Sequence, residues 1–342
     1  MSLIEELREG PTVVERLLDE GREDVRRLAS EIRRRDIANV LIAARGTSDH
    51  AAIYAQYVFG ARNALPVALA APSLVSVYHR PPRLRDTVVI GISQSGRSPD
   101  IVAVLEDARS QGALTAALTN DEASDLAQVA DHLIALRAGP EKATAATKTY
   151  LAEIAALAML SAALDGDETG DAELRALPAS LHAALDLEGR AAELASARAG
   201  IDRCAVLGRG FQYATAREWA LKLKEMTYVL ADPYSAADFQ HGPVALVEAD
   251  FPVLAVATSG AVLDGMVELI ERVRAERANL LVASDLPEVI GDGDGFLLPS
   301  APEWLAPVVA IIPAQLFAYH LAIARGLDTE APRNISKVTL TT

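Results

Sequence analysis

The chain of 342 residues carries one framework of residues twice, at a constant separation of 164 positions. Six residues in and around a Ser/Gly loop obey this shift: Val89, Ser95, Gly96, Asp100, Leu105 and Asp121 recur as Val253, Ser259, Gly260, Asp264, Leu269 and Asp285. Ala44-Arg45-Gly46 likewise recurs as Gly208-Arg209-Gly210, and each copy follows an apolar run. A constant offset over this span indicates a duplicated structural unit. We therefore expect two compact units of one kind.

Short β-branched runs alternate with longer helical periods in both halves of the chain. Strands are expected near residues 38–43, 66–70, 87–92, 114–118, 132–135, 203–207, 252–257, 279–283 and 295–298. This alternation predicts an α/β fold with two doubly wound parallel sheets. The expected parts are an N-terminal helical segment (1–35), a first unit (36–165), a helical linker (166–200), a second unit (201–331) and a C-terminal tail (332–342).

Charge and composition indicate which classes of partner and which cellular compartment to expect. The formal net charge of −15, without a segment rich in Lys and Arg, argues against nucleic acid. The single cysteine, Cys204, lies in an apolar run and is expected in the core, so no disulfide framework is present. Residues 1–20 form an acidic amphipathic pattern without the apolar centre of a signal peptide. Residues 304–324 resemble a membrane span, but Pro313 and His320 favour a buried helix. We expect a cytoplasmic protein with no membrane partner.

The segment 88–109 takes an apolar strand into a Ser/Gly loop that opens a helix. Such a loop suits a phosphate, because short side chains and the amides of the first helical turn supply donors. The donors here are Ser93, Gln94, Ser95 and Ser98, and Gly96 lets the backbone come close. The plainer alternative is a helix N-cap. The second copy has Ala257 and Val262 in place of Ser93 and Ser98, so we expect one phosphate site per chain, in the first half.

Two further segments carry candidate catalytic groups. Lys222 and Glu225 are three residues apart on a predicted helix and share a face, although such spacing alone usually means a surface ion pair. His241 stands directly before Gly-Pro, which predicts a turn, and a turn-borne histidine beside a carboxylate suits a proton shuttle.

The polar tail around Lys337 is the other candidate. A C-terminal run of this kind is ordinarily frayed. Pro332 and Asn334 nevertheless predict a defined turn, and residues 338–340 alternate as a short strand would. A lysine fixed there suits a carbonyl-activating amine.

Four motifs in order give the chain a family resemblance. They are Gly46-Thr47-Ser48, Ser93-Gln94-Ser95-Gly96, the block Leu221-Lys222-Leu223-Lys224-Glu225 followed by His241-Gly242-Pro243, and Pro332-Arg333-Asn334 with Lys337. Over nearly its full length the chain resembles tandem sugar-isomerase (SIS) domain proteins, and in particular the isomerase half of the glucosamine-6-phosphate synthases. The resemblance implies two flavodoxin-like, Rossmann-like domains.

The resemblance also implies roles for individual residues. The phosphate of the sugar would be held by Ser93, Gln94, Ser95, Ser98 and Thr47. Its sugar part would lie near Ser48, Thr144 and Ala145. Glu225 would carry the proton between C1 and C2, with Lys222 supporting its carboxylate. His241 would open the ring of a substrate in a neighbouring subunit, and Lys337 would engage the ketose carbonyl. A homodimer with shared active sites is implied. The chemistry requires no metal or cofactor.

Some residues depart from the family pattern. Thr144 and Ala146 stand where the family usually has Val and Ser, and Arg45 stands where the synthase has Cys, so the bound sugar can differ from fructose 6-phosphate. The chain begins Met1-Ser2-Leu3 ahead of the first unit, where the synthase has a glutaminase domain, so we expect no ammonia from glutamine.

These observations predict an amino-sugar-phosphate deaminase/isomerase that turns glucosamine 6-phosphate into fructose 6-phosphate and ammonia. Three alternatives stay open. The chain could be the isomerase component of a synthase-like aminotransferase, or a deglycase acting on a fructosamine 6-phosphate. Outside enzymology it could be a sugar-phosphate sensor, although it begins without a basic helix-turn-helix.

Overall fold

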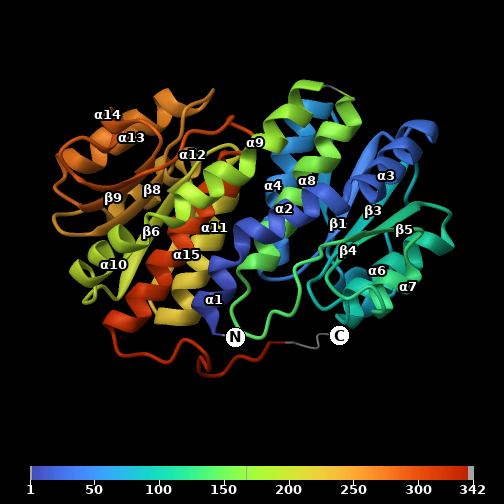
Figure 1. Ribbon diagram of the computed structural model, residues 1–342, viewed down its shortest axis with the longest axis horizontal. Helices are drawn as coiled ribbons and strands as arrows, with labels where there is room; N and C mark the ends of the chain where they lie inside the picture. The colour runs from blue at the N-terminus through green and yellow to red at the C-terminus, as the bar shows by residue number, and fades with distance from the viewer. Residues whose placement is uncertain (1, 167, 338–342) are drawn as a thin grey trace. The chain divides into compact units, whose positions relative to one another are not determined.

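The computed structural model describes residues 2–166 and 168–337. The chain divides into two compact units, each described by itself (Figure 1). We call Glu9–Glu141, Ala146–Ala176 and the residues from Ser336 onward the N-terminal unit. The residues up to Arg8, Lys142–Ala145 and Leu177–Ile335 form the C-terminal unit.

A five-stranded parallel sheet of order β2-β1-β3-β4-β5 forms the centre of the N-terminal unit. Its strands are β1 (Asn39–Ala43), β2 (Val67–Leu69), β3 (Thr87–Ile92), β4 (Leu114–Thr119) and β5 (His132–Ala135). Its helices are α2 (Gly10–Glu20), α3 (Arg22–Arg34), α4 (Thr47–Asn63), α5 (Ser73–Ser76), α6 (Pro99–Ser110), α7 (Asp125–Val129) and α8 (Lys148–Asp165). β3 and β4 are buried along their whole length, as the central strands of a covered parallel sheet require.

Close packing of helix α6 on strand β3 fixes the start of that helix. A Cβ added at Gly91 of β3 would lie 2.8 Å from a methyl of Leu105 on α6, so glycine is needed for this approach. Val89, Ile101 and Leu105 belong to the apolar cluster between α6 and the sheet. The loop between β3 and α6 is therefore anchored at both of its ends.

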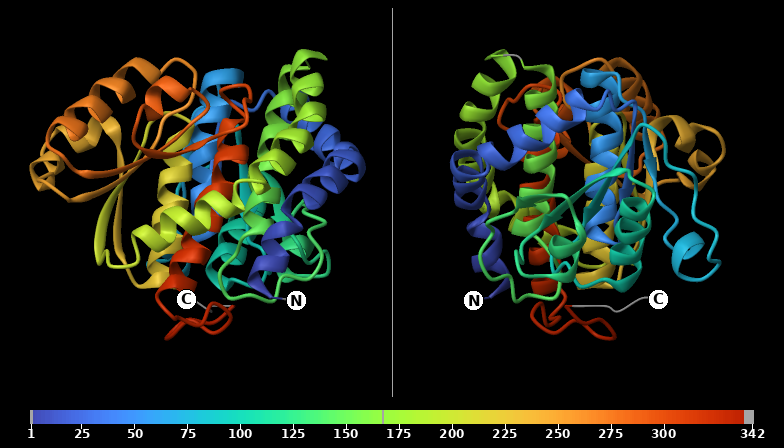
Figure 2. Two further views of the ribbon diagram at one scale, coloured as in Figure 1. Left: turned by 60° about the vertical axis from the view of Figure 1, so that its left-hand side comes forward. Right: turned by 90° about the vertical axis from the view of Figure 1, so that its right-hand side faces the viewer.

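The C-terminal unit repeats this design with a sheet of order β10-β9-β8-β6-β7. Its strands are β6 (Arg203–Gly208), β7 (Leu230–Ser235), β8 (Pro252–Val256), β9 (Asn279–Ser284) and β10 (Asp294–Leu297). Its helices are α1 (Leu3–Arg8), α10 (Glu188–Ala197), α11 (Gln212–Thr227), α12 (Ala236–Gln240), a 3-10 turn Pro243–Leu246, α13 (Leu263–Ala275), α14 (Pro287–Ile290) and α15 (Ala306–Ala324), while α9 (Glu168–Leu185) leads into the unit. Figure 2 shows α13 and α15 on opposite faces of this sheet.

The duplication inferred from the 164-residue offset is confirmed by topology. With β6, β7, β8, β9 and β10 taken as the counterparts of β1, β2, β3, β4 and β5, the two sheets have the same strand order. Every expected strand is present, but β7 was not predicted. It contains Asp232 and Pro233, residues depleted in strands, and it lies at the sheet edge, where a missing backbone N–H is tolerated.

The apolar helix near the C-terminus is a core element. By length and composition α15 could cross a membrane, yet 83% of its apolar window is buried inside the structure. The expected buried helix is thus confirmed. Cys204 in β6 is also buried, and burial raises the pKa of its thiol to about 12, which keeps it protonated.

Candidate active site

The Ser/Gly loop between β3 and α6 forms a tight turn that is held by its own hydrogen bonds. The amides of Gly96 and Arg97 donate to the hydroxyl oxygens of Ser93 and Ser95, at 3.1 and 3.4 Å. The carbonyl of Gln94 accepts the amide of Asn120 at 3.1 Å, which connects the loop to the end of β4. Gly96 has a φ of +62°, and a Cβ there would lie 2.1 Å from Ser124 Oγ. Only glycine satisfies both demands.

The Ser98 hydroxyl, at the start of α6, is available to a ligand. Ser98 occupies the N-cap position, but its side chain makes no capping hydrogen bond, so simple capping does not account for this serine. Beside it, Arg45 from the β1–α4 turn donates twice to the buried carboxylate of Asp100, at 2.9 and 2.8 Å. The same turn leads into Thr47 and Ser48 at the start of α4. The Ser48 hydroxyl donates to Glu153 at 2.8 Å.

The tail lysine is held by a buried carboxylate of the same unit. Lys337 Nζ lies 2.5 Å from Glu141 Oε2. Glu141 also accepts the amides of Thr147 and Thr149, at 2.9 and 3.1 Å, and the Thr149 hydroxyl at 2.8 Å. Burial raises the pKa of the Glu141 carboxyl, but Lys337 and these hydrogen bonds outweigh burial and lower it. The tail is therefore anchored at Lys337, while the strand expected at 338–340 lies outside the described residues.

In the C-terminal unit, α11 carries a buried lysine between two carboxylates. Lys222 Nζ lies 2.6 Å from Glu225 Oε2 and 3.3 Å from Glu218 Oε1. Burial lowers the pKa of Lys222, but the two carboxylates outweigh burial and raise it, so the ammonium stays charged. The side chains of Lys222 and Glu218 are fully buried, whereas that of Glu225 is 24% exposed. The surface-pair alternative is therefore wrong, and Glu225 presents an oriented carboxylate to solvent.

His241 lies in a turn, between the end of α12 and the short helix Pro243–Leu246. Its amide donates to the carbonyl of Asp238 at 3.0 Å. The residue is exposed, and its imidazole forms no hydrogen bond or ion pair with the described part of the chain. The side chain is therefore free to meet a ligand or a second protein chain.

Comparison with known proteins decides the family. The SIS domain model matches residues 34–163 and 199–325. The chain belongs to the SIS domain family. The first SIS segment lies in the N-terminal unit except for Lys142–Ala145, and the second lies in the C-terminal unit.

The relatives agree with the resemblance seen in the sequence. The glutamine–fructose-6-phosphate aminotransferase (isomerizing) of Thermococcus kodakarensis is 36% identical over 346 residues, which cover 98% of this chain and 57% of that protein. The chain thus spans a little over half the length of this relative. The C-terminal domain of the corresponding Francisella tularensis aminotransferase is 26% identical with a TM-score of 0.89, covering 96% of this chain and 97% of that one. A candidate phosphosugar isomerase of Silicibacter pomeroyi is 38% identical with a TM-score of 0.88, covering 95% and 98%.

The loop of the second SIS segment is filled by its own side chains. Asp285 accepts the amide of Ser259 at 2.8 Å and also its hydroxyl, and Glu303 accepts the amide of Ala261 at 2.9 Å. Val262 covers Gly210, whereas a Cβ at the equivalent Gly46 would meet open space. The donors that a phosphate needs are thus already used in this loop.

Sequence reasoning missed two carboxylates of the candidate site. Glu218 completes the charge cluster at Lys222, and Glu141 holds Lys337. The repeated spacing of Glu218, Lys222 and Glu225 on one helical face was a usable indication of the first. The expected sugar-binding residues Thr144 and Ala145 belong to the C-terminal unit, and Ala145 is buried.

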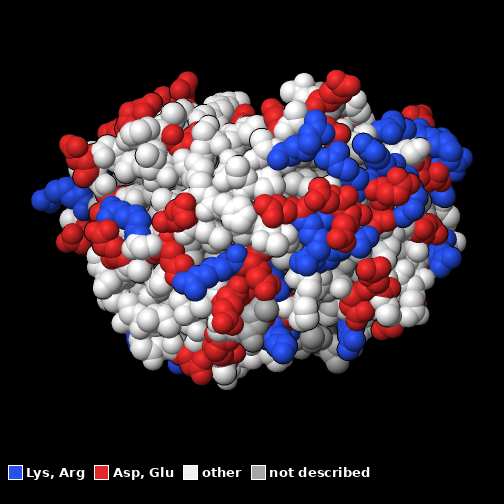
Figure 3. Space-filling model, viewed as in Figure 1, with Lys and Arg blue, Asp and Glu red and all other residues white. Residues whose placement is uncertain are grey.

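Other features of the SIS units lie outside this site. Figure 3 shows acidic and basic side chains interspersed over α2 and α3, so this face offers no continuous basic stripe for nucleic acid.

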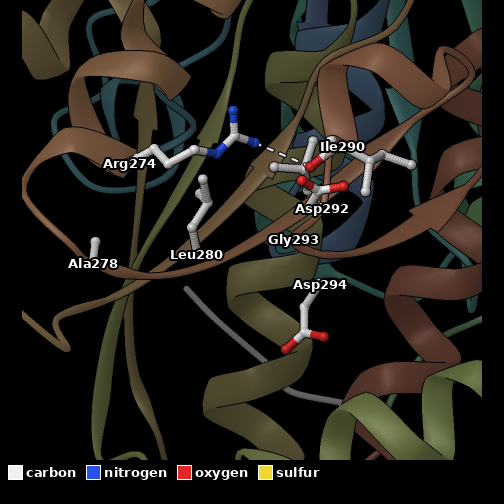
Figure 4. Close-up of a pocket in the computed structure, with 9 residues that line it drawn as sticks. Arg274, Ala278, Leu280, Ile290, Asp292, Gly293 and Asp294 are labelled. Atoms are coloured by element: carbon white, nitrogen blue, oxygen red, sulfur yellow. Dashed lines mark hydrogen bonds between the residues drawn. The ribbon is translucent and has the colours of Figure 1, made fainter.

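A cleft of about 470 Å³ in the C-terminal unit is lined by Arg274, Leu280 and Asp294 among others (Figure 4), and holds none of the expected site residues. Within the described residues no group of three His, Cys, Asp or Glu side chains is arranged to hold a metal.

Proposed function

We propose that the protein is an amino-sugar-phosphate deaminase/isomerase that converts glucosamine 6-phosphate and water into fructose 6-phosphate and ammonia. The observation that carries this proposal is the buried Lys222 pairing with a partly exposed Glu225 in the second SIS segment. An oriented carboxylate is the group that an aldose–ketose proton transfer requires. The similarity to aminotransferases named as isomerizing supports the same class of chemistry.

Binding is assigned to the Ser/Gly loop of the N-terminal unit and to four further residues. Ser93, Gln94, Ser95, Ser98 and Thr47 hold the phosphate, and Ser48, Thr144 and Ala145 contact the sugar. The phosphate takes no part in the chemistry. Its binding energy is used to hold C1 and C2 where the proton is transferred.

The chemical steps are assigned to four residues. His241 donates a proton to the ring oxygen. The bond between this oxygen and C1 breaks, the C1 hydroxyl gives up its proton, and the sugar opens to the aldehyde. Glu225 removes the proton from C2, which leaves an enolate over O1, C1 and C2, and returns it to C1. O1 takes up one proton and the amine gives one up, so the product is the C2 imine of fructose. Lys337 places positive charge beside the developing oxyanion, and Lys222 orients Glu225. Water then adds to C2 of the imine, and ammonia leaves.

A second candidate is the isomerase component of a glucosamine-6-phosphate synthase-like aminotransferase. It is favoured by the match of 98% of this chain to a glutamine–fructose-6-phosphate aminotransferase (isomerizing). It uses the same residues in the opposite direction, with ammonia supplied to fructose 6-phosphate. For either reaction we propose a cytoplasmic homodimer, in which the exposed His241 serves the active site of the neighbouring subunit.

The decisive experiment follows ammonia and fructose 6-phosphate together after addition of glucosamine 6-phosphate to the purified protein. Equimolar release of both supports the deaminase. Turnover of fructose 6-phosphate only when ammonia or another nitrogen donor is supplied supports the aminotransferase component. Release of an amino acid from a fructosamine 6-phosphate would identify a deglycase, and stabilisation by sugar phosphates without turnover would identify a sensor.

A further inference from the structure

Equivalent carboxylates in the two SIS loops accept hydrogen bonds from different residues. Asp121 and Asp285 occupy equivalent positions at the 164-residue offset, as do Ser95 and Ser259. In the second loop, Asp285 accepts both the amide and the hydroxyl of Ser259. In the first loop, Asp121 instead accepts Arg97 Nη2 and the amide of Ala123, both at 3.1 Å.

Among the residues that differ between the loops, two bear on this difference. Ala123, whose amide donates to Asp121, has Pro287, which has no N–H, as its equivalent, and the other is the residue at position 97. Position 97 is arginine, and its equivalent in the second loop is Ala261. In the second loop, where neither of these donors is present, the carboxylate accepts the amide and the hydroxyl of the loop serine. A carboxylate bound there takes the hydroxyl proton that a phosphate would accept, and its negative charge repels the phosphate dianion.

We propose that Arg97 is a positioning residue that holds Asp121 away from Ser95 and so keeps the first loop open for the substrate phosphate. The inference rests on the proposed phosphate site and adds a residue that keeps this site open. Its effect falls on binding and not on stability. The side chains of Arg97 and Asp121 are 65% and 37% exposed, and an ion pair of that exposure adds little to folding.

The test is a double-mutant cycle of Arg97→Ala, Asp121→Ala and the double variant. Fructose 6-phosphate binding is measured by calorimetry, and KM and kcat are measured with glucosamine 6-phosphate. We expect Arg97→Ala to raise Kd and KM by roughly tenfold or more with kcat nearly unchanged. The double variant should return to within about threefold of Asp121→Ala, because the competing carboxylate is gone.

Two further variants serve as controls. Arg97→Lys should keep most of the affinity, since a lysine can still pair with Asp121. Arg109→Ala removes an exposed arginine on α6 whose Nε lies 3.5 Å from Asp131 Oδ1, and should leave binding unchanged. Melting temperatures of all variants should agree with that of the parent.

Each alternative gives a different pattern. A double variant as weak as Arg97→Ala would overturn the inference and show that Arg97 contacts the phosphate itself. Unchanged binding in Arg97→Ala would show that Arg97 and Asp121 form only a surface ion pair without effect on phosphate binding. If Ser98→Ala weakens binding while Arg97→Ala does not, the phosphate site stands and the inference fails. If the parent protein binds no sugar phosphate, the proposed function fails first.

Discussion

The two lysine–glutamate pairs of the candidate site are arranged in opposite senses. In the pair on α11, Lys222 is fully buried and Glu225 is 24% exposed. In the tail pair, Glu141 is fully buried and Lys337 is 21% exposed. In each pair the buried member is fixed by further partners, and the other member reaches solvent.

The difference shows how one kind of ion pair can present either sign of charge. Burial of an ion costs roughly several kcal/mol in lost hydration, and an ion pair and hydrogen bonds must offset this cost. The buried member of each pair is therefore held in place by several partners. Its partner is thereby oriented without being enclosed. We infer that Glu225 and Lys337 meet the substrate, as base and as cation, while Lys222 and Glu141 position them.

The largest effect is expected when the exposed base is removed. Glu225→Gln keeps the shape and a hydrogen bond to Lys222 but cannot take up a proton, so turnover should fall by about a thousandfold. Steady-state release of fructose 6-phosphate measures the loss. Unchanged sugar-phosphate binding is the control, and undiminished turnover would refute the role of Glu225.

Removing the buried lysine should cost stability as well as activity. Lys222→Met leaves Glu218 buried without its countercharge, and breaking a buried pair in this way typically costs about 3–5 kcal/mol. Urea unfolding measures the loss. The double variant Lys222→Met, Glu218→Gln should recover much of that stability but little activity. Equal loss in the single and the double variant would show that the charge of Glu218 is not the cause.

The sequence predicted this site unevenly, for reasons that lie in the residues themselves. The central strands were recognised because strands buried on both faces are continuous apolar runs, as in β3. The spacing of Lys222 and Glu225 predicts a shared face but not its depth, which depends on packing against helices distant in the chain. Lys337 and Glu141 are separated by 196 residues, and nothing local in either segment indicates that they meet.

The tail pair gives a pH-dependent test. The pKa of Glu141 lies below its usual value in the folded protein, so its contribution is present above about pH 4.5 and is lost as the pH falls through the lower folded pKa. In Lys337→Met the positive charge that counteracts burial is gone, so burial raises the pKa of Glu141. The variant should therefore be less stable than the parent at neutral pH, and this deficit should shrink toward pH 4. A deficit independent of pH would assign the loss to packing alone.

The smallest effect is expected at a third pair, which tests whether burial of one partner is enough to make the other functional. Lys148 is nearly fully buried, and its Nζ lies 2.6 Å from Glu9 Oε2, whose side chain is 41% exposed. This pair resembles that of Lys222, but within the described residues no second carboxylate pairs with Lys148, and solvent can replace the charge of Glu9. Glu9→Gln should thus cost about 1 kcal/mol or less in urea unfolding and leave turnover within about twofold. A loss of turnover approaching that of Glu225→Gln would place Glu9 in the active site and end the distinction drawn between the pairs.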